Sequence, residues 1–220
     1  MMERAVIHSD LKKQEIQPQP MLDQYIALLN EDIKKMLPAG SLQNVFCPVT
    51  GEQAVRESFR KMDMQYKISR TLGNIYLSPR PAMNVLNTFY RNSRARKFWL
   101  NELWSQTQDV RQDKIILPQL EWSHGFISQY LSESKLLMAE FLPNHWGYYQ
   151  GARNLWPEAA YKLVEPLFDL DISDSKISAS NIIDDSSSST LDAAFLFEAL
   201  DRSPEPLLIL RKVASVLKPG

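Results

Sequence analysis

A single cysteine, Cys47, is the scarcest chemical feature of this 220-residue sequence. One thiol cannot form an internal disulfide, and a tetrahedral zinc site built on thiolates needs several ligands. The absence of disulfides is typical of a reducing compartment. We therefore expect a cytoplasmic protein that binds no metal.

The sequence also lacks an excess of charge and a long apolar run. Its 25 basic and 26 acidic residues give a formal net charge of -1, which provides no electrostatic basis for binding nucleic acid or an anionic membrane. No stretch approaches the roughly 18 apolar residues of a membrane span, and the polar N-terminus lacks the apolar core of a signal peptide. We expect neither nucleic acid nor a membrane as partner.

The sequence has the apolar content of a globular protein, 44%, and its patterns divide it into three regions. Residues 1–19 are polar and indicate a flexible arm. Residues 20–131 are mainly helical, with a small β-hairpin region at about 45–81. Residues 132–220 alternate short apolar runs with helical patterns, which favours βαβ units and a parallel sheet.

Within the helical region, apolar spacing predicts a helix over residues 21–37, which Pro38 and Gly40 end. Strand-like stretches at 66–70 and 74–77 flank Gly73 and predict a hairpin. Residues 82–131 are expected to be helical, with Ser93 capping a second helix and a third helix over 120–131. We interpret their regularly spaced aromatic residues as core.

In the third region, the pattern predicts strands at 135–142, 161–164, 177–183 and 192–197, with a helix at 147–155. Ser203 and Pro204 have the residue types of a helix cap and a first helical position. The helix after them presents a stripe of Leu207, Leu210, Ala214 and Leu217, which Ile209, Val213 and Val216 widen. Lys218, Pro219 and Gly220 form a stop signal.

The closing stretch, residues 191–220, resembles class I S-adenosylmethionine-dependent methyltransferases. The features that match are the aspartate that opens the strand, Asp192, an acidic residue after it, Glu198, the turn at 203–206 and the Leu-Lys-Pro-Gly ending at 217–220. The resemblance implies a Rossmann-like parallel sheet, present in part, and a methyltransferase domain over residues 132–220.

The resemblance also implies a site for S-adenosylmethionine at the carboxyl ends of the strands. Glu165 takes the place of the ribose ligand, and Asp184 or Asp185 that of the adenine contact. Gly147 is the one glycine left of the family's glycine-rich first loop. Phe197 and Glu198, at the end of the last strand, complete the implied cofactor set.

The first strand and its loop depart from the family pattern. Met138 stands where the family has an acidic residue, and the loop carries bulky side chains instead of glycines: Phe141, Leu142, Pro143 and Trp146. His145 in this loop is either a ligand contact or a residue without functional role. The family's acidic–histidine pair is Asp201-Arg202 here, so no histidine is available as a base at that place.

Residues 47–51 and 69–81 resemble the N-terminal zinc ribbon of some methyltransferases in this family. Cys47-Pro48-Val49-Thr50-Gly51 matches the first knuckle with one cysteine lost, and Ser69-Arg70-Thr71-Leu72-Gly73 matches the second with both lost. One thiol and two hydroxyls do not supply the four nitrogen or sulfur ligands of tetrahedral zinc. We predict a hairpin that is held by packing alone.

The chain stops where a fifth strand would begin, which leaves the edge of the 192–197 strand to be covered. An exposed apolar edge favours association. We expect either a longer natural chain or a protein partner on this edge, with a second copy of the chain as one candidate.

Three functions follow from these features. The first is a methyltransferase acting on a sugar or another small-molecule substrate. The second is a catalytically inactive methyltransferase-fold module for binding or scaffolding. The third is a helical adaptor whose resemblance is accidental, and it predicts no parallel sheet.

Overall fold

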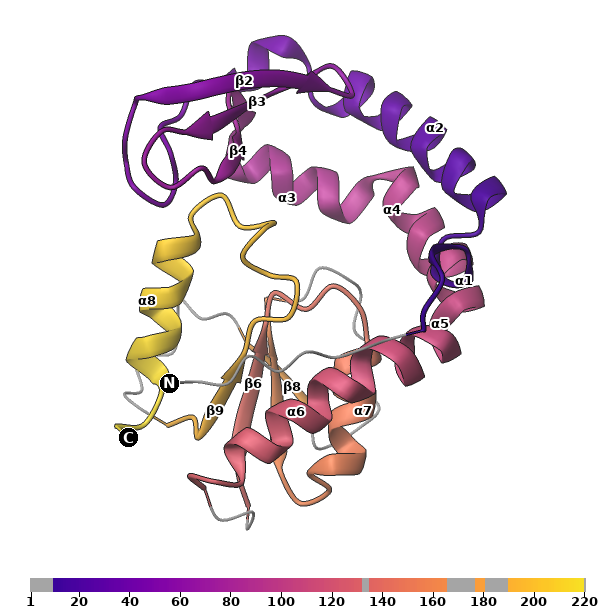
Figure 1. The fold of residues 1–220 in the computed structure, drawn as a ribbon, viewed down its shortest axis with the longest axis vertical. Helices are drawn as coiled ribbons and strands as arrows, with labels where there is room; N and C mark the ends of the chain where they lie inside the picture. Colours follow the sequence, from indigo (N-terminus) through magenta and orange to yellow (C-terminus); the bar gives the residue numbers. More distant parts are fainter. Residues whose placement is uncertain (1–9, 132–134, 166–176, 181–189, 220) are drawn as a thin grey trace.

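The computed structural model describes residues 10–131, 135–165, 177–180 and 190–219. The chain is a mixed α/β protein in which a mainly helical layer arches over a parallel sheet (Figure 1). The parallel sheet excludes the helical adaptor as a description of this chain.

The helical layer begins with α1 (Lys13–Ile16) and α2 (Gln19–Met36), followed by the short turn η1 (Ala39–Ser41). Helix α2 confirms the helix that the sequence predicts at 21–37. Residues 10–19, which belong to the expected flexible arm, are anchored in the structure. Arg111 donates a hydrogen bond to the carbonyl of Ile16, and Lys114 pairs with Glu15 at 3.1 Å.

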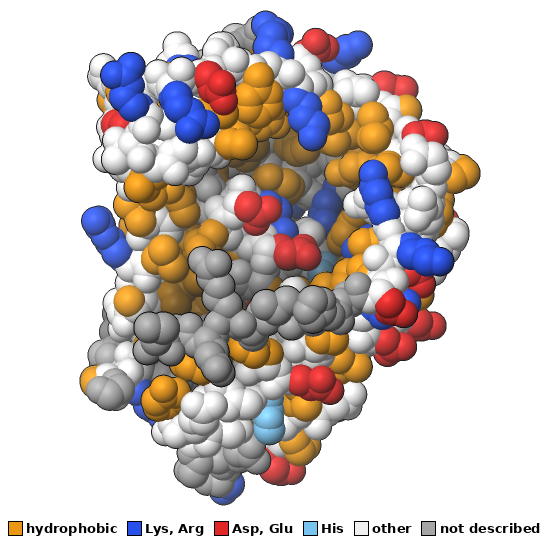
Figure 2. All heavy atoms as spheres, viewed as in Figure 1, with side chains coloured by type: hydrophobic (Ala, Val, Ile, Leu, Met, Phe, Trp, Pro, Cys, Tyr) orange, Lys and Arg blue, Asp and Glu red, His pale blue; other side chains and the backbone are white. Residues whose placement is uncertain are grey.

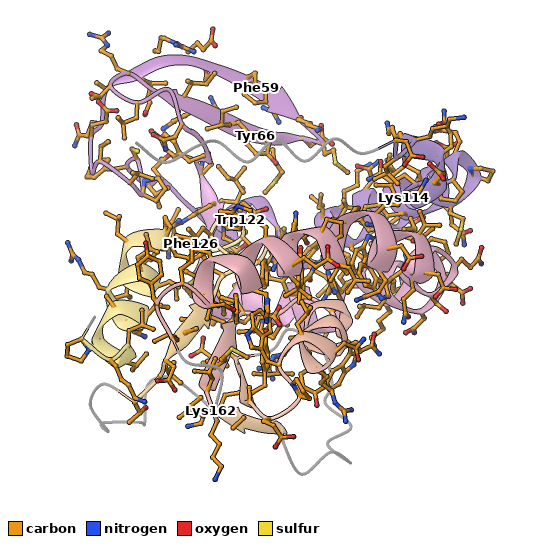
Figure 3. The ribbon with its side chains drawn as sticks, turned by 60° about the horizontal axis from the view of Figure 1, so that its bottom comes forward. Phe59, Tyr66, Lys114, Trp122, Phe126 and Lys162 are labelled. Atoms are coloured by element: carbon orange, nitrogen blue, oxygen red, sulfur yellow. The ribbon has the colours of Figure 1, made fainter. Side chains whose placement is uncertain are left out.

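Two small antiparallel sheets follow. Strands β2 (Val55–Lys61), β3 (Met64–Ser69) and β4 (Ile75–Leu77) form one, while β1 (Leu42–Gln43) and β5 (Arg80–Pro81) form the other. The predicted hairpin is therefore confirmed. The sequence did not predict β2, because its mostly exposed and charged residues show no apolar alternation. Figure 3 shows Phe59 of β2 beside Tyr66 of β3, with stacked ring centroids 5.3 Å apart.

Helix α3 (Met83–Asn92) ends at Ser93, which caps α4 (Arg94–Phe98) as predicted, because its hydroxyl accepts a hydrogen bond from the backbone N–H of Arg96. Beyond α4 the chain remains helical to Ile127, through η2 (Trp99–Trp104), α5 (Ser105–Arg111), η3 (Gln112–Ile116) and α6 (Leu117–Ile127). The expected separate third helix is thus part of one continuous run.

Segments η2 and η3 are π-helical, with hydrogen bonds that span five residues instead of four. This wider turn brings residues five apart to the same side of the helix. In η2 it places Trp99 beside Trp104, with ring centroids 5.3 Å apart. Both tryptophans then face the loop that follows the first strand of the parallel sheet.

The parallel sheet contains β6 (Leu137–Phe141), β7 (Ala160–Val164), β8 (Ile177–Ser180) and β9 (Ala193–Phe195) in the order β8-β7-β6-β9. Helix α7 (Gly147–Leu155) connects β6 to β7, and α8 (Pro206–Val216) follows β9. The strands and the helix at 147–155 that the sequence predicts are confirmed within the described residues.

Alternate residues of β6 enter two separate cores. Met138 faces a core that includes Leu163 of β7 and Leu120 of α6. Phe141 faces the second core, against Val213 of α8. Helices therefore cover both faces of the sheet, and α6, from the predicted helical region, supplies part of that cover.

Helix α8 differs from the sequence prediction at its start and in its buried face. It begins at Pro206 and not at Pro204, because a residue before proline is driven out of the helical conformation and Glu205 has φ -130° and ψ 68°. The buried residue is Val213, while Leu207 and Leu210 are about 40% exposed. The helix is apolar on both sides, so periodicity alone did not identify its inner face.

The ends of the methyltransferase-like segment meet in space. The Asp192 carboxylate accepts hydrogen bonds from the Leu137 backbone N–H, at 2.8 Å, and from Lys218 Nζ, at 2.7 Å. Leu217 forms a parallel bridge with Leu191 at the outer side of β9. This bridge lies just before β9, and the strand itself is the edge of the sheet, paired with β6 alone among the described residues.

Candidate functional site

A cleft of about 1360 Å³ lies between the helical layer and the carboxyl ends of the parallel strands. Figure 2 looks into this hollow and shows basic and acidic side chains inside it. In open parallel sheets, ligands bind outside the carboxyl ends of the strands. The cleft is therefore the candidate functional site, and its lining includes Leu142, His145, Glu165 and Arg202.

Three strands end in a residue with left-handed backbone conformation. Leu142 after β6, Glu165 after β7 and Glu198 after β9 have φ values of 53°, 50° and 49°. Residues other than glycine seldom adopt this conformation, which is found repeatedly at ligand sites. The chain thus turns sharply at each strand end and leaves the sheet edge facing the cleft.

His145 fills the centre of the loop between β6 and α7. It is 3% exposed and stacks on Trp104 of η2 with ring centroids 3.7 Å apart. Its Nδ1 accepts a hydrogen bond from the Gly147 backbone N–H at 3.1 Å. Burial, and then the nearby cations of Arg111 and Arg202, lower the pKa of His145 to about 3. The imidazole is therefore neutral and serves as a filler of the loop.

Gly147 provides close packing between helices. A Cβ atom at this position would lie 2.5 Å from Ile116 and 3.0 Å from Trp104. The family resemblance assigns this glycine to the cofactor loop. In the structure it faces η2 and η3, and α7 packs closely against these two segments. A side chain here would push these elements apart.

Glu140 is an acidic residue in β6, two positions beyond Met138. It is 1% exposed, and the Tyr161 hydroxyl donates a hydrogen bond to it at 3.3 Å. Burial raises the pKa of Glu140 to about 8, so this carboxyl group is protonated at neutral pH. Met138 itself is fully buried in the core. Glu140 was not predicted as a site residue, and the one sequence feature that marks it is an acidic side chain within an otherwise apolar strand.

Phe197 and Glu198 follow β9. Phe197 stacks on Tyr148 of α7 with ring centroids 3.9 Å apart and nearly parallel planes. Glu198 is half exposed and lies 3.7 Å from Arg202. Phe197 is therefore engaged with a core residue, while Glu198 borders the cleft through its arginine partner.

Glu165, which the resemblance implies as the ribose ligand, follows β7 directly and lines the cleft. The implied adenine contacts, Asp184 and Asp185, lie outside the described residues. The structure brings Glu165 to the same cleft as the loop of His145. Gly147 and Phe197 contact protein side chains instead.

Two arginines that line the cleft, Arg96 and Arg202, had no role predicted from the sequence. Arg96 of α4 donates to the Asn144 carbonyl at 2.5 Å, and Arg202 donates to the Leu142 carbonyl at 3.3 Å. Both therefore hold the loop between β6 and α7. They are more than a hundred residues apart in sequence, so no local pattern could have paired them.

Hydrogen bonds to the Cys47 sulfur fix the turn at 47–51, which the sequence analysis compares with a zinc ribbon. The Thr50 backbone N–H points to Cys47 Sγ at 3.4 Å, and Asn74 Nδ2 donates to the same sulfur at 3.3 Å. Ser69 donates to Asn74 Oδ1 at 2.6 Å. Asn74 thus bridges Cys47 and Ser69. In the part of the chain that the structure describes, no cluster of three histidine, cysteine or acidic residues could hold a metal.

Comparisons of this chain with protein-family models, with curated proteins and with solved structures gave no match. Among the described residues, no helix is both long enough and apolar enough to cross a membrane.

Proposed function

We propose that this chain is a binding module with the frame of a class I methyltransferase, and that its cleft holds a small-molecule ligand without methyl transfer. The strand order β8-β7-β6-β9 supports this frame, since a doubly wound sheet begins with its strands in the order 3-2-1-4. The contact between Asp192 and Lys218 supports it further, because it joins two positions of the family segment.

The filled loop after β6 carries the proposal. A cofactor loop of this family must let the ligand approach its backbone, which is why it is rich in glycine. Here the loop contains buried Pro143 and His145, and the His145 ring stacks with the rings of Trp104 and Tyr148. The carbonyls of Leu142 and Asn144 accept hydrogen bonds from arginines. This arrangement occupies the space that the methionine part of the cofactor would need.

A working methyltransferase that acts on a sugar or another small metabolite is the second candidate. One observation favours it, namely that Glu165 lines the cleft at the end of β7, where the resemblance places the ribose ligand.

Isothermal titration with S-adenosylmethionine separates the two candidates. We expect no saturable heat at millimolar cofactor, with wild type and with Glu165→Ala. Glu158→Ala is the matched control, because Glu158 is an exposed glutamate in the turn before β7, at the opposite end of the strand. Micromolar binding by wild type that Glu165→Ala abolishes and Glu158→Ala preserves would establish the enzyme instead.

A further inference from the structure

We infer that the cleft takes an anionic small molecule, and that Arg96 and Arg202 bind its phosphate or carboxylate group. The inference rests on the proposed function, since it names the ligand class of the same cleft. It has its own test, because it concerns the two arginines and not the cofactor loop.

The charge of the cleft differs from that of the chain as a whole. The chain has a formal net charge of -1. Two acidic side chains, Glu165 and Glu205, line the cleft. Five basic side chains line it: Arg91, Arg96, Lys97, Arg202 and Lys212. Positive charge in a concave, partly apolar site focuses the electric field and attracts anions.

The two arginines reach the base of the cleft from different elements. Arg96 comes from α4 and Arg202 from the segment between β9 and α8, and each is fixed by one hydrogen bond to a carbonyl of the 142–146 loop. The two accepting carbonyls, of Leu142 and Asn144, are two residues apart. The loop therefore holds both guanidinium groups in place at one part of the sheet edge.

Among the described residues, Arg96 and Arg202 each donate one hydrogen bond to a protein acceptor. A guanidinium carries five N–H donors, of which the Nε of both Arg96 and Arg202 is buried and has no hydrogen-bond partner among the described residues. Arg202 has Glu198 at 3.7 Å, which is a long contact to a half-exposed group. Arg96 has no carboxylate within 4.0 Å in the described part of the chain. An oxyanion in the cleft would give the two guanidinium groups further charge-assisted acceptors.

The arginines also repel each other. Burial and the Arg202 cation together lower the pKa of Arg96 to about 10. An anion bound between the two groups would compensate both charges. Such compensation is larger in a partly buried site than in water.

The cleft is large enough for a small molecule, and its lining combines apolar and basic side chains. The cleft volume of about 1360 Å³ exceeds the usual range for small-ligand pockets, roughly 300–1,000 Å³. Its walls include Leu86, Tyr90 and Trp104 beside the basic groups. This mixture suits a ligand that has an acidic group at one end and an apolar or ring-shaped part at the other.

Titration calorimetry with two simple anions tests the inference. Sodium pyrophosphate represents phosphate ligands and sodium malonate represents dicarboxylates, and sodium chloride keeps the ionic strength constant. We expect saturable binding of at least one of them. Arg96→Gln and Arg202→Gln should each weaken it by about tenfold or more, since each removes a charge-assisted hydrogen bond.

Arg56→Gln is the matched control, because Arg56 is an exposed arginine on β2 outside the cleft lining, and its binding should equal that of wild type. Arg202→Lys keeps the charge and should bind more weakly than wild type but more tightly than Arg202→Gln. If Arg96→Gln does not fold, the comparison of anion binding by wild type, Arg202→Gln and Lys212→Gln takes its place. Binding of pyrophosphate would indicate a phosphate ligand, and binding of malonate would indicate a carboxylate ligand.

Absence of saturable binding by both anions would overturn the inference, as would equal binding by wild type, Arg202→Gln and Arg56→Gln. Neither result would bear on the missing cofactor site, which the S-adenosylmethionine titration tests by itself. Tight cofactor binding, in turn, would refute the proposed function and leave the anion result standing.

Discussion

Two buried titratable side chains, Glu140 and His145, give the stability of this chain opposing pH dependences. The pKa of Glu140 is raised from 4.5 to about 8, and that of His145 is lowered from 6.5 to about 3. Between pH 4.5 and 8 the folded state retains a proton on Glu140 that the unfolded state has lost, so stability falls as pH rises. Between pH 3 and 6.5 the unfolded state binds a proton that folded His145 does not, so stability rises.

Glu140→Gln should remove the first of these dependences. Above pH 6.5 His145 no longer contributes, so the wild-type free energy of unfolding should fall by at most about 1.4 kcal/mol per pH unit up to pH 8. The amide keeps an acceptor for the Tyr161 hydroxyl and has no proton to lose. Urea unfolding at several pH values between 6.5 and 8 measures both slopes. Equal slopes in the two proteins would show that Glu140 is ionised in the folded state.

Asp32 of α2 is a buried carboxylate that joins α2 to α4. Its Oδ2 accepts hydrogen bonds from the Ser93 hydroxyl and the Ala95 backbone N–H, both at 2.8 Å. Burial raises the pKa of Asp32, but these hydrogen bonds and Arg94 outweigh burial and lower it. The stabilisation is therefore present above the ordinary aspartate pKa and is lost as pH falls through the folded-state value.

Asp32→Ala should lower the free energy of unfolding by roughly 2–3 kcal/mol at neutral pH, because it leaves a buried N–H and hydroxyl without their acceptor. Asp23→Ala, at an exposed position of the same helix, should change it by less than about 0.5 kcal/mol. Denaturant unfolding measures both. A similar small effect for the two variants would contradict the assigned role of Asp32.

At the scale of elements, the hairpin between β2 and β3 has a turn whose residues do not suit its backbone. Met62 and Asp63 both have positive φ, 52° and 58°, and they are the two residues between the paired Lys61 and Met64. Two-residue turns of this kind prefer Asn-Gly. Methionine adopts the left-handed conformation only at a cost in free energy, and aspartate adopts it less readily than glycine.

The double substitution Met62→Asn, Asp63→Gly should therefore stabilise the protein by roughly 1 kcal/mol. Lys61→Gly is the control, because Lys61 lies in the extended strand, where glycine destabilises. Thermal unfolding should thus move in opposite directions for the two proteins. A lower melting temperature for the Asn-Gly variant would mean that the turn has another conformation in solution.

Element boundaries could be predicted where a local rule decides them. The helix at 147–155 and the strands β6, β7 and β9 follow from apolar runs, and Ser93 is a cap because its hydroxyl reaches the first turn of α4. The prediction was incorrect for the start of α8, where the effect of Pro206 on Glu205 outweighed the cap signal of Ser203. The π-helical turns η2 and η3 have no sequence signature and were not predicted.

At the scale of the whole molecule, the cleft is assembled from residues that are far apart in sequence. The position of Glu165 at a strand end could be predicted, because it follows an apolar strand. Arg96, Trp104 and Arg202 could not be predicted, since they meet only after the helical layer has folded over the sheet. The methyltransferase resemblance is local to short segments, so it could not predict how the helical layer meets the sheet.

The proposed function requires that the loop after β6 is filled by side chains and leaves no room for S-adenosylmethionine. Trp104 reports on this directly, because its indole stacks on His145 inside the loop. Two-dimensional ¹H–¹⁵N spectra can follow its indole signal, assigned with Trp104→Phe, while the cofactor is added to millimolar concentration. The account predicts no change in the signal of Trp104. A saturable shift of this signal at micromolar cofactor would contradict it.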